Sequence, residues 1–179
     1  MDNNISKALE EKVKKLQTLI DSSKRIVFFG GAGVSTESGI PDFRSEDGLY
    51  RQKYKYPPET ILSHTFFVRN TADFYEFYRD KMICDTAEPN ITHKFLAELE
   101  EKGKLLGVVT QNIDGLHQAA GTKNIAELHG SIHRNYCTKC RKFHPLSAVK
   151  SSKGIPLCEC GGIIKPDVVL YEEGLDGET

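Results

Sequence analysis

The first twenty residues alternate apolar and charged positions in a helical pattern. Their apolar residues are three or four positions apart, at Ile5, Leu9, Val13, Leu16 and Ile20. This spacing places one apolar stripe along one face of an α-helix, whereas the interleaved lysines and glutamates form a solvated face. The chain is therefore predicted to open with an amphipathic helix whose apolar stripe packs on a sheet.

Three short apolar runs have the composition of buried strands, at residues 26–29, 105–110 and 125–128. The first is bounded by charged residues and glycine, which is typical of a fully buried strand. Pro89 and Asn90 precede a helical pattern that ends near Gly103, and another helix is expected to start within residues 111–120. A fourth short strand is predicted over residues 168–171. Strands that alternate with helices indicate an α/β fold.

The strand pattern disappears between residues 45 and 85. Pro57 and Pro58 break the chain there, and a helical stretch follows. That stretch carries the aromatic residues Phe66, Phe67, Phe74, Tyr75, Phe77 and Tyr78. We interpret them as a small hydrophobic core rather than as a ligand-binding box, because buried aromatic side chains commonly dominate such cores.

A glycine-rich run directly follows the first predicted strand. It reads Gly31-x-Gly33-x-x-Thr36, so its third position is not glycine. Glycines let the backbone approach a phosphate, and a helix that starts after them offers unpaired N–H groups and a positive dipole end. Taken alone, the glycines fit a nucleotide site and a tight strand-to-helix turn equally well.

Four of the five cysteines occur in two closely spaced pairs, Cys137 with Cys140 and Cys158 with Cys160. Short cysteine turns present thiolate pairs to a tetrahedral Zn²⁺ ion, and four thiolates complete a closed site. We therefore predict one structural zinc ion, with His144 as a nearby residue that the closed site does not need. Cys84 stands alone and is expected to be a buried, small apolar residue.

Composition excludes several classes of partner. The net charge of −1 over 179 residues argues against a basic nucleic-acid footprint. The N-terminal region lacks the apolar core of a secretory signal, and no apolar run approaches the roughly 18 residues of a membrane span. Cysteines paired in an unsignalled chain indicate metal rather than disulfides, so we expect a cytoplasmic protein with no membrane contact.

Among the six histidines, His129 is the one best placed for catalysis. It ends the strand predicted at 125–128, on the sheet edge where the glycine run and residues 111–114 should converge. An imidazole is the natural general base at physiological pH. His129 is therefore the candidate base.

Several motifs follow one another in a characteristic order. They are Ser38-Gly39-Ile40-Pro41-Asp42-Phe43-Arg44, Gln111-Asn112-Ile113-Asp114, Leu128-His129-Gly130, the four cysteines, and Ile164-Lys165-Pro166-Asp167-Val168-Val169. In this order they resemble the sirtuins, the NAD-dependent protein deacylases, from about Lys24 to about Tyr171. The resemblance implies a partial Rossmann-like doubly wound parallel sheet, into which a small zinc-ribbon and a helical module are inserted.

The resemblance also implies how the chain is divided. Residues 1–44, 86–133 and 165–179 would form the NAD-binding Rossmann-like domain. Residues 45–85 would form a mobile cofactor-binding loop and a helical module, and residues 134–164 the zinc-binding module. Sirtuins continue past the position of Thr179, so the resemblance implies a Rossmann-like domain without its C-terminal half, with an unpaired sheet edge and apolar surface left exposed.

Residue roles follow from the same motifs. His129 is expected to accept a proton from the nicotinamide ribose, with Asn112 and Asp114 as further catalytic residues and Phe43 as a shield over the ribose. NAD is expected to contact Gly31, Ala32, Gly33, Thr36, Asp42, Phe43, Arg44, Gln111, Asn112, Ile113, Asp114 and His129. Helix capping is the alternative role for Asn112 and Asp114, and both roles can hold together.

The implied activity is removal of acetyl groups from lysine side chains of proteins, with NAD as co-substrate and nicotinamide and O-acetyl-ADP-ribose as products. Tyr75, Tyr78 and Arg79 lack the Tyr-x-x-Arg spacing of succinyl-preferring sirtuins, so acetyl-lysine is the expected substrate. Two alternatives stay open, namely protein mono-ADP-ribosyl transfer and a binding module without turnover. The chain is expected to be a monomer.

Overall fold

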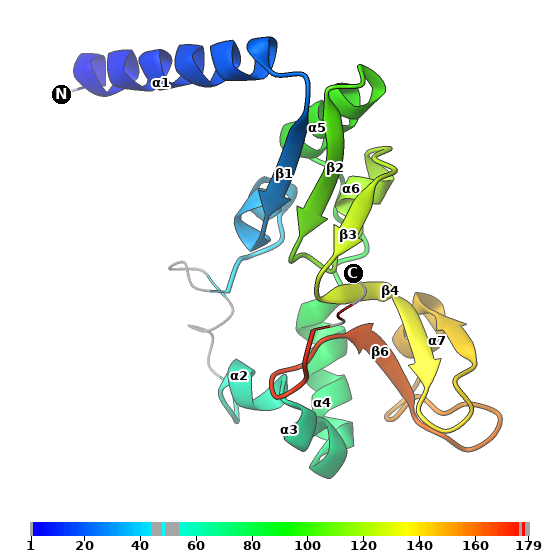
Figure 1. The fold of residues 1–179 in the computed structure, drawn as a ribbon. Helices are drawn as coiled ribbons and strands as arrows, with labels where there is room; N and C mark the ends of the chain where they lie inside the picture. Colours follow the sequence, from blue (N-terminus) through cyan, green and yellow to red (C-terminus); the bar gives the residue numbers. More distant parts are fainter. Residues whose placement is uncertain (1, 44–47, 49–53, 176, 178–179) are drawn as a thin grey trace.

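The structure is a computed structural model that describes residues 2–43, 48, 54–175 and 177, with side-chain surroundings from residue 7 onward. The three predicted strands form a parallel sheet in the order β1 (Ile26–Gly30), β2 (Leu105–Thr110), β3 (Ile125–Glu127). Their register brings Gly30 beside Thr110, and Thr110 beside Glu127. All three strands therefore end in one row, and the loops that follow them meet at one edge of the sheet (Figure 1).

The glycine run continues β1 as two short 3₁₀ turns, η1 (Ala32–Val34) and η2 (Thr36–Ser38). The expected α-helix after the glycines is thus wrong. Gly39 closes the second turn at φ 82°, a conformation in which a side chain would be strained. The amide of Asn90 holds both turns, because its Nδ2 donates to the Val34 carbonyl at 2.7 Å and to the Ser38 hydroxyl at 3.0 Å.

Helix α5 (Ile91–Glu101) covers one face of the parallel sheet (Figure 1). The helix predicted after Pro89 and Asn90 forms, and Asn90 caps it, since its side-chain oxygen accepts from the N–H groups of Thr92 and His93. Gly103 follows the helix at φ 68°. The helix buries Leu96 and Leu99 against Leu105 and Val108 of β2. The helix predicted within residues 111–120 is only the short α6 (Leu116–Ala119).

Helix α1 (Asp2–Ser22) forms as predicted, but its apolar stripe does not pack on the sheet. It extends away from the sheet in Figure 1, and Leu9 and Val13 are 60% and 58% exposed. Ile20 alone among the described stripe residues reaches the cluster beneath α5. Ile5 lies outside the part whose side chains are described. The predicted packing is therefore wrong for most of the stripe.

Strand β1 is buried on one face and open on the other. Ile26 and Phe28 pack toward α5, whereas Val27 and Phe29 are 60% and 63% exposed. Alternate residues of a strand point to opposite faces, and within the described chain only the α5 side is covered. The prediction of a fully buried strand is thus wrong for every second residue.

The aromatic stretch forms a small helical module, built from α2 (Pro58–Ile61), α3 (His64–Arg69), α4 (Thr71–Phe77) and the π-helical turn η4 (Tyr78–Met82). All six predicted aromatic residues are buried, which confirms the hydrophobic-core interpretation. The Tyr75 hydroxyl donates to the Ile164 carbonyl and so links this module to the next sheet. The loop predicted at its start lies largely outside the described residues.

A small antiparallel sheet holds the cysteine module, in the order β5 (Phe143–Pro145), β4 (Gly130–Cys137), β6 (Ile164–Val168), with α7 (Leu146–Lys150) beside it. The α/β class with a separate cysteine module is confirmed. The fourth strand predicted over 168–171 is wrong, because β6 ends at Val168 and pairs with β4 instead. Beyond β6, Tyr171 forms only an isolated bridge with Ser63. The predicted domain boundaries stay a prediction.

No helix in the described part of the chain combines the length and apolarity needed to cross a membrane.

Two histidines pack ring against ring beneath the sheet edge. His93 of α5 and His117 of α6 are buried, with ring centroids 4.7 Å apart. Among the described residues, His93 Nε2 and both nitrogens of His117 have no hydrogen-bond partner. Burial, reinforced by His93, lowers the pKa of His117 to about 4 despite the opposing charge of Asp114. The His117 ring is therefore neutral inside the folded protein at pH 7.

This pair is expected to make the protein acid-sensitive. Between pH 6.5 and about 4, the His117 imidazole is protonated in the unfolded chain but stays neutral in the folded protein. The free energy of unfolding therefore falls as pH falls. The slope from one such group reaches about 1.4 kcal/mol per pH unit. Urea unfolding at pH 7 and pH 5 should show a smaller pH dependence for His117→Gln than for the unsubstituted chain. Equal pH dependence in both proteins would contradict it.

Candidate active site and metal centre

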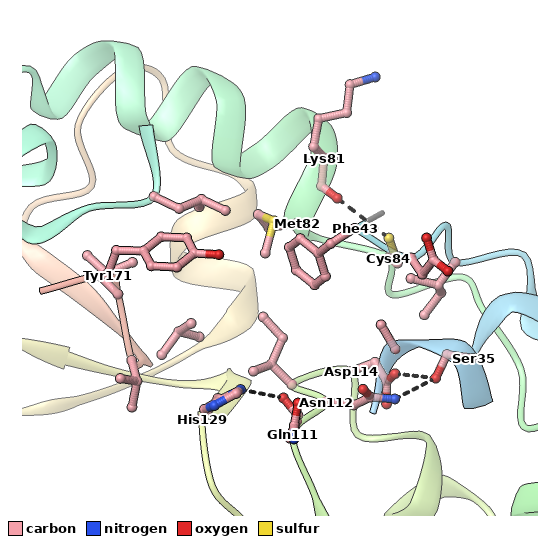
Figure 2. Close-up of a pocket in the computed structure, with 18 of the residues that line it drawn as sticks. Ser35, Phe43, Lys81, Met82, Cys84, Gln111, Asn112, Asp114, His129 and Tyr171 are labelled. Atoms are coloured by element: carbon pink, nitrogen blue, oxygen red, sulfur yellow. Dashed lines mark hydrogen bonds between the residues drawn. The ribbon is translucent and has the colours of Figure 1, made fainter. Parts of the chain in front are cut away.

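A cavity of about 630 Å³ opens where the three parallel strands end. The loop after β1, the loop after β2 and His129, two residues after β3, each contribute part of its wall (Figure 2). Open α/β sheets bind ligands at the carboxyl ends of their strands. The predicted site residues that line it are Ala32, Gly33, Asp42, Phe43, Gln111, Asn112, Ile113, Asp114 and His129.

Three polar side chains link the first two loops beneath the cavity. The Ser35 hydroxyl donates to Asp114 Oδ2 at 2.7 Å, and Asn112 Nδ2 donates to the Ser35 oxygen at 2.9 Å. Figure 2 shows the three converging from the two loops. Ser35 is only 1% exposed. A buried, fully bonded network of this kind fixes the relative position of its members.

Sequence reasoning missed Ser35. It lies inside the glycine-rich run, where a serine is expected as an ordinary turn residue. No spacing rule pairs it with residues some eighty positions further along the chain. The only local indication of such a partner was the polar run from Gln111 to Asp114, because polar side chains that become buried need hydrogen-bond partners.

The Asp114 carboxylate supports α6 and also reaches the cavity wall. Its Oδ1 accepts the Leu116 N–H at 2.9 Å, which supports the start of α6. Its Oδ2 accepts from Ser35 at the cavity wall. The backbone N–H of Asn112 is bonded to the Thr110 hydroxyl at 3.0 Å. The loop that carries these residues is therefore fixed at several points before any ligand arrives.

His129 faces the cavity with one nitrogen already occupied. Its Nδ1 lies 3.0 Å from the Gln111 carbonyl oxygen. Since a carbonyl oxygen only accepts hydrogen bonds, Nδ1 must carry the proton, and the neutral ring keeps its lone pair on Nε2. This arrangement leaves Nε2 free to accept a proton from a bound molecule.

Two predicted residues among those described, Gly31 and Thr36, do not line the cavity. Gly31 packs close to Gln111, where an added Cβ would lie 3.5 Å from Oε1. The Thr36 hydroxyl bonds the Gly33 carbonyl at 3.0 Å, within its own turn. Arg44 lies outside the described residues.

The opposite wall comes from segments that the sequence did not mark. Leu62 and Met82 belong to the helical module, and the segment after β6 supplies Val169 to Glu173. In Figure 2, Phe43, Met82 and Tyr171 approach one another across the cavity. Cys84 also lines it and is half-buried rather than buried; burial first, then nearby Asp114 and Asp85, raise the pKa of its thiol.

The four paired cysteines meet at the far end of the antiparallel sheet. Their sulfur atoms all lie within 4.8 Å of one another, with 3.4 Å from Cys137 to Cys160 and 3.7 Å from Cys140 to Cys158. Four sulfurs at about 2.3 Å from a tetrahedral zinc ion would be about 3.8 Å apart. The cluster fits a structural zinc ion.

Local backbone geometry supports a thiolate cluster. The N–H groups of Lys139 and Cys140 both point at the Cys137 sulfur, each at 3.4 Å. Gly162 is needed for packing, because an added Cβ would approach that sulfur to 2.5 Å. These contacts hold the cysteine loops in the shape that four-fold coordination requires.

Comparison with known proteins gives the family. The model of the Sir2 family matches residues 31–179. The chain belongs to the Sir2 family. It is 63% identical over 172 residues to an NAD-dependent protein deacetylase of Clostridium acetobutylicum and 59% identical over 167 residues to one of Clostridium tetani. These matches cover 94% and 91% of this Sir2-family chain, and 70% and 68% of the relatives.

Solved Sir2 structures share its fold. A Sir2 complex with a deacetylated p53 peptide and 3′-O-acetyl ADP ribose matches with a TM-score of 0.83 and 39% identity, over 92% of this chain and 68% of that one. A complex of Sir2 with a p53 peptide and NAD⁺ matches with a TM-score of 0.79 and 39% identity, over 92% and 67%. The family resemblance predicted from ordered motifs is thus confirmed.

Loss of one cysteine ligand is expected to release the metal. Cys140→Ser should lower zinc content well below one ion per chain and lower the melting temperature, because such sites contribute on the order of 10 kcal/mol to folding. Elemental analysis and thermal unfolding measure both effects. Cys84→Ser, the matched control at the unpaired cysteine, should keep its zinc. Full zinc occupancy in Cys140→Ser would contradict the assignment.

Removal of the Ser35 hydroxyl is expected to destabilise the loops at the cavity. Ser35→Ala removes the hydrogen bonds of Asn112 Nδ2 and Asp114 Oδ2 to Ser35, so the free energy of unfolding should fall by about 2 kcal/mol. Thr36→Ala, whose hydroxyl bonds an exposed turn, should cost less than half as much. Urea unfolding of the two variants checks this, and equal losses would be evidence against the Ser35 network.

Proposed function

We propose that the protein is an NAD-dependent protein lysine deacetylase that converts NAD, an acetyl-lysine side chain and one water molecule into nicotinamide, free lysine and O-acetyl-ADP-ribose. The single observation that carries this proposal is the cavity geometry, in which His129 Nε2 keeps a free lone pair beside the Ser35, Asn112 and Asp114 network. The relatives named as NAD-dependent protein deacetylases support it. We place the enzyme in the cytoplasm, acting as a monomer on acetylated proteins.

The residues around the cavity supply distinct parts of the chemistry. Cleavage of the bond between nicotinamide and ribose builds positive charge on the sugar, which the acetyl oxygen of the substrate attacks. His129 accepts the proton of a ribose hydroxyl as that attack proceeds. Asp114 and Ile113 receive the nicotinamide carboxamide, and Asn112 and Gln111 contact the ribose. Phe43 shields the sugar from water, which would otherwise hydrolyse NAD.

The glycine run completes the NAD site. Gly31, Ala32 and Gly33 bring backbone close to the bound phosphates, with Thr36, Asp42 and Arg44 as further contacts. The turns here are 3₁₀ and only three residues long, so dipole stabilisation of the phosphates is smaller than a full α-helix would give. Backbone N–H groups and the Arg44 charge therefore carry most of the phosphate binding in this proposal.

The positions of Tyr75 and Arg79 favour an acetyl group over a succinyl group. Tyr75 is buried and its hydroxyl is bonded to the Ile164 carbonyl. Arg79 donates to Ser152 and to the Gly154 carbonyl, on the other side of the helical module. Lys81 borders the cavity, but its amine pairs with Asp80 at 3.1 Å and points away in Figure 2. None of these three side chains offers a cation to a succinyl carboxylate.

Mass spectrometry of an acetyl-lysine peptide incubated with the protein and NAD tests the proposal. We expect loss of one acetyl group with release of nicotinamide, and at least a hundredfold slower turnover in His129→Ala, the scale of a lost general base. Asp73→Asn, which alters an exposed ion pair, serves as control for a surface substitution. A succinyl peptide should react far more slowly.

Two other outcomes would replace the proposal. Addition of ADP-ribose to the target protein, without loss of acetyl, would indicate mono-ADP-ribosyl transfer. Peptide binding without any turnover would indicate a binding module.

A further inference from the structure

The cavity wall after β6 connects His129 to the helical module. Its Val169 N–H donates to the His129 carbonyl at 3.0 Å. Two residues on, the Tyr171 N–H donates to the Leu62 carbonyl at 2.9 Å, and the Tyr171 carbonyl accepts from His64 at 3.0 Å. Residues 169–173 are called the bridging segment here. In the described structure they belong to no helix or strand, so the position of the segment depends on how its two ends are held.

Glu173 holds the far end of the bridging segment. One carboxylate oxygen accepts the Leu170 N–H at 2.9 Å and the Lys165 amine at 3.1 Å. The other lies 2.8 Å from His64 Nδ1 at the start of α3. One side chain thus joins the segment to itself, to β6 and to the helical module.

The Glu173 carboxylate is half-buried, with 22% of its side chain exposed. Burial opposes ionisation, but the Leu170 hydrogen bond and the contacts with His64 and Lys165 outweigh it and hold the pKa of Glu173 below its usual range. A charged carboxylate with several donors in partial burial is a stronger restraint than an exposed ion pair.

Glu172 adds a second attachment from a strained backbone. Its φ is 75°, a region that residues other than glycine rarely occupy, and Arg141 is the other such residue in the described chain. Its carboxylate accepts the Thr65 N–H of α3 at 2.9 Å. Backbone strain of this kind persists where the surroundings over-determine it, commonly at functional sites.

We propose that Glu173 is a positioning residue that fixes the bridging segment between His129 and α3, and so sets the wall against which the acyl-lysine peptide binds. The peptide part rests on the proposed function. The direct contacts of Glu173 are with Leu170, Lys165 and His64, not with any reacting atom. Its effect on the site passes through Leu170 and Val169 to the backbone of His129.

Three variants of the 179-residue chain test this role. Glu173→Ala removes all contacts, Glu173→Gln keeps an acceptor for Leu170 but loses the charge toward Lys165, and Asp73→Asn alters an exposed ion pair in the same helical module. Amide hydrogen exchange followed by NMR reports on the segment without any ligand. We expect exchange at Val169 and Tyr171 to rise about tenfold in Glu173→Ala, less in Glu173→Gln and not at all in Asp73→Asn.

Binding of a fluorescent acetyl-lysine peptide, measured by anisotropy well below the melting temperature, supplies the second readout. The Kd should rise about tenfold in Glu173→Ala and only a few-fold in Glu173→Gln. Unchanged exchange and unchanged Kd in Glu173→Ala would overturn the proposal. Faster exchange that extends equally to Val108 and Val109 of β2 would also overturn it, because that pattern signals a purely structural role.

The two proposals fail separately. If the unsubstituted protein binds no acetyl-lysine peptide, the proposed function fails, and the exchange measurement alone decides the role of Glu173. Suppose instead that the unsubstituted protein binds the peptide, but substitution of Glu173 changes neither amide exchange in the bridging segment nor the Kd. Only the positioning role then fails.

Discussion

The hydrogen bond from the Ser35 hydroxyl to the Asp114 carboxylate is the contact on which the candidate site depends. The turns that follow β1 are 3₁₀ and too short to be stable alone. The loop after β2 likewise has little regular structure before α6. Because Ser35 is buried and also accepts from Asn112, it fixes the two loops against each other. Asn90 anchors the same turns to α5 from the other side.

A second constraint places His129 at the junction of the two sheets. Gly130 follows it at φ 78°, and an added Cβ there would overlap the Asp167 carbonyl at 1.8 Å. Arg134 of β4 bonds Glu127 of β3 at 2.5 Å and Asp167 of β6 at 2.8 Å. The backbone on both sides of His129 is therefore held in place, by the Arg134 ion pairs and by the close packing at Gly130. The imidazole can then be oriented by one further bond, from Nδ1 to the Gln111 carbonyl.

Local patterns in the sequence predicted much of this arrangement. The run at 105–110 predicted β2 with its observed bounds, the helix after Asn90 was placed correctly, and the four cysteines were paired by spacing. These features depend on neighbours a few residues apart. His129 was located because strand ends converge at one sheet edge, which is a rule of topology rather than of local sequence.

What the sequence could not predict depends on distant partners. The α1 stripe is amphipathic wherever it lies, so its pattern could not reveal which surface, if any, covers Leu9 and Val13. Residues 168–171 have strand composition, but their neighbour in space is the Leu62–His64 turn, a hundred positions earlier. The sequence analysis missed Ser35 for the same reason, since its hydrogen-bond partners lie 77 and 79 residues away.

The metal centre and the cavity wall share one hydrophobic core, so the cysteine module influences the cavity wall as well as its own loops. Cys137 and Cys158 belong to the same buried cluster as Phe66 and Leu170. Leu170 lines the cavity, whereas the cysteines lie at the far end of the antiparallel sheet. Close-packed interiors transmit displacements, because they hold few voids that could absorb them. An ion that fixes the cysteine loops therefore also stabilises, through β6 and this shared core, the wall that faces His129.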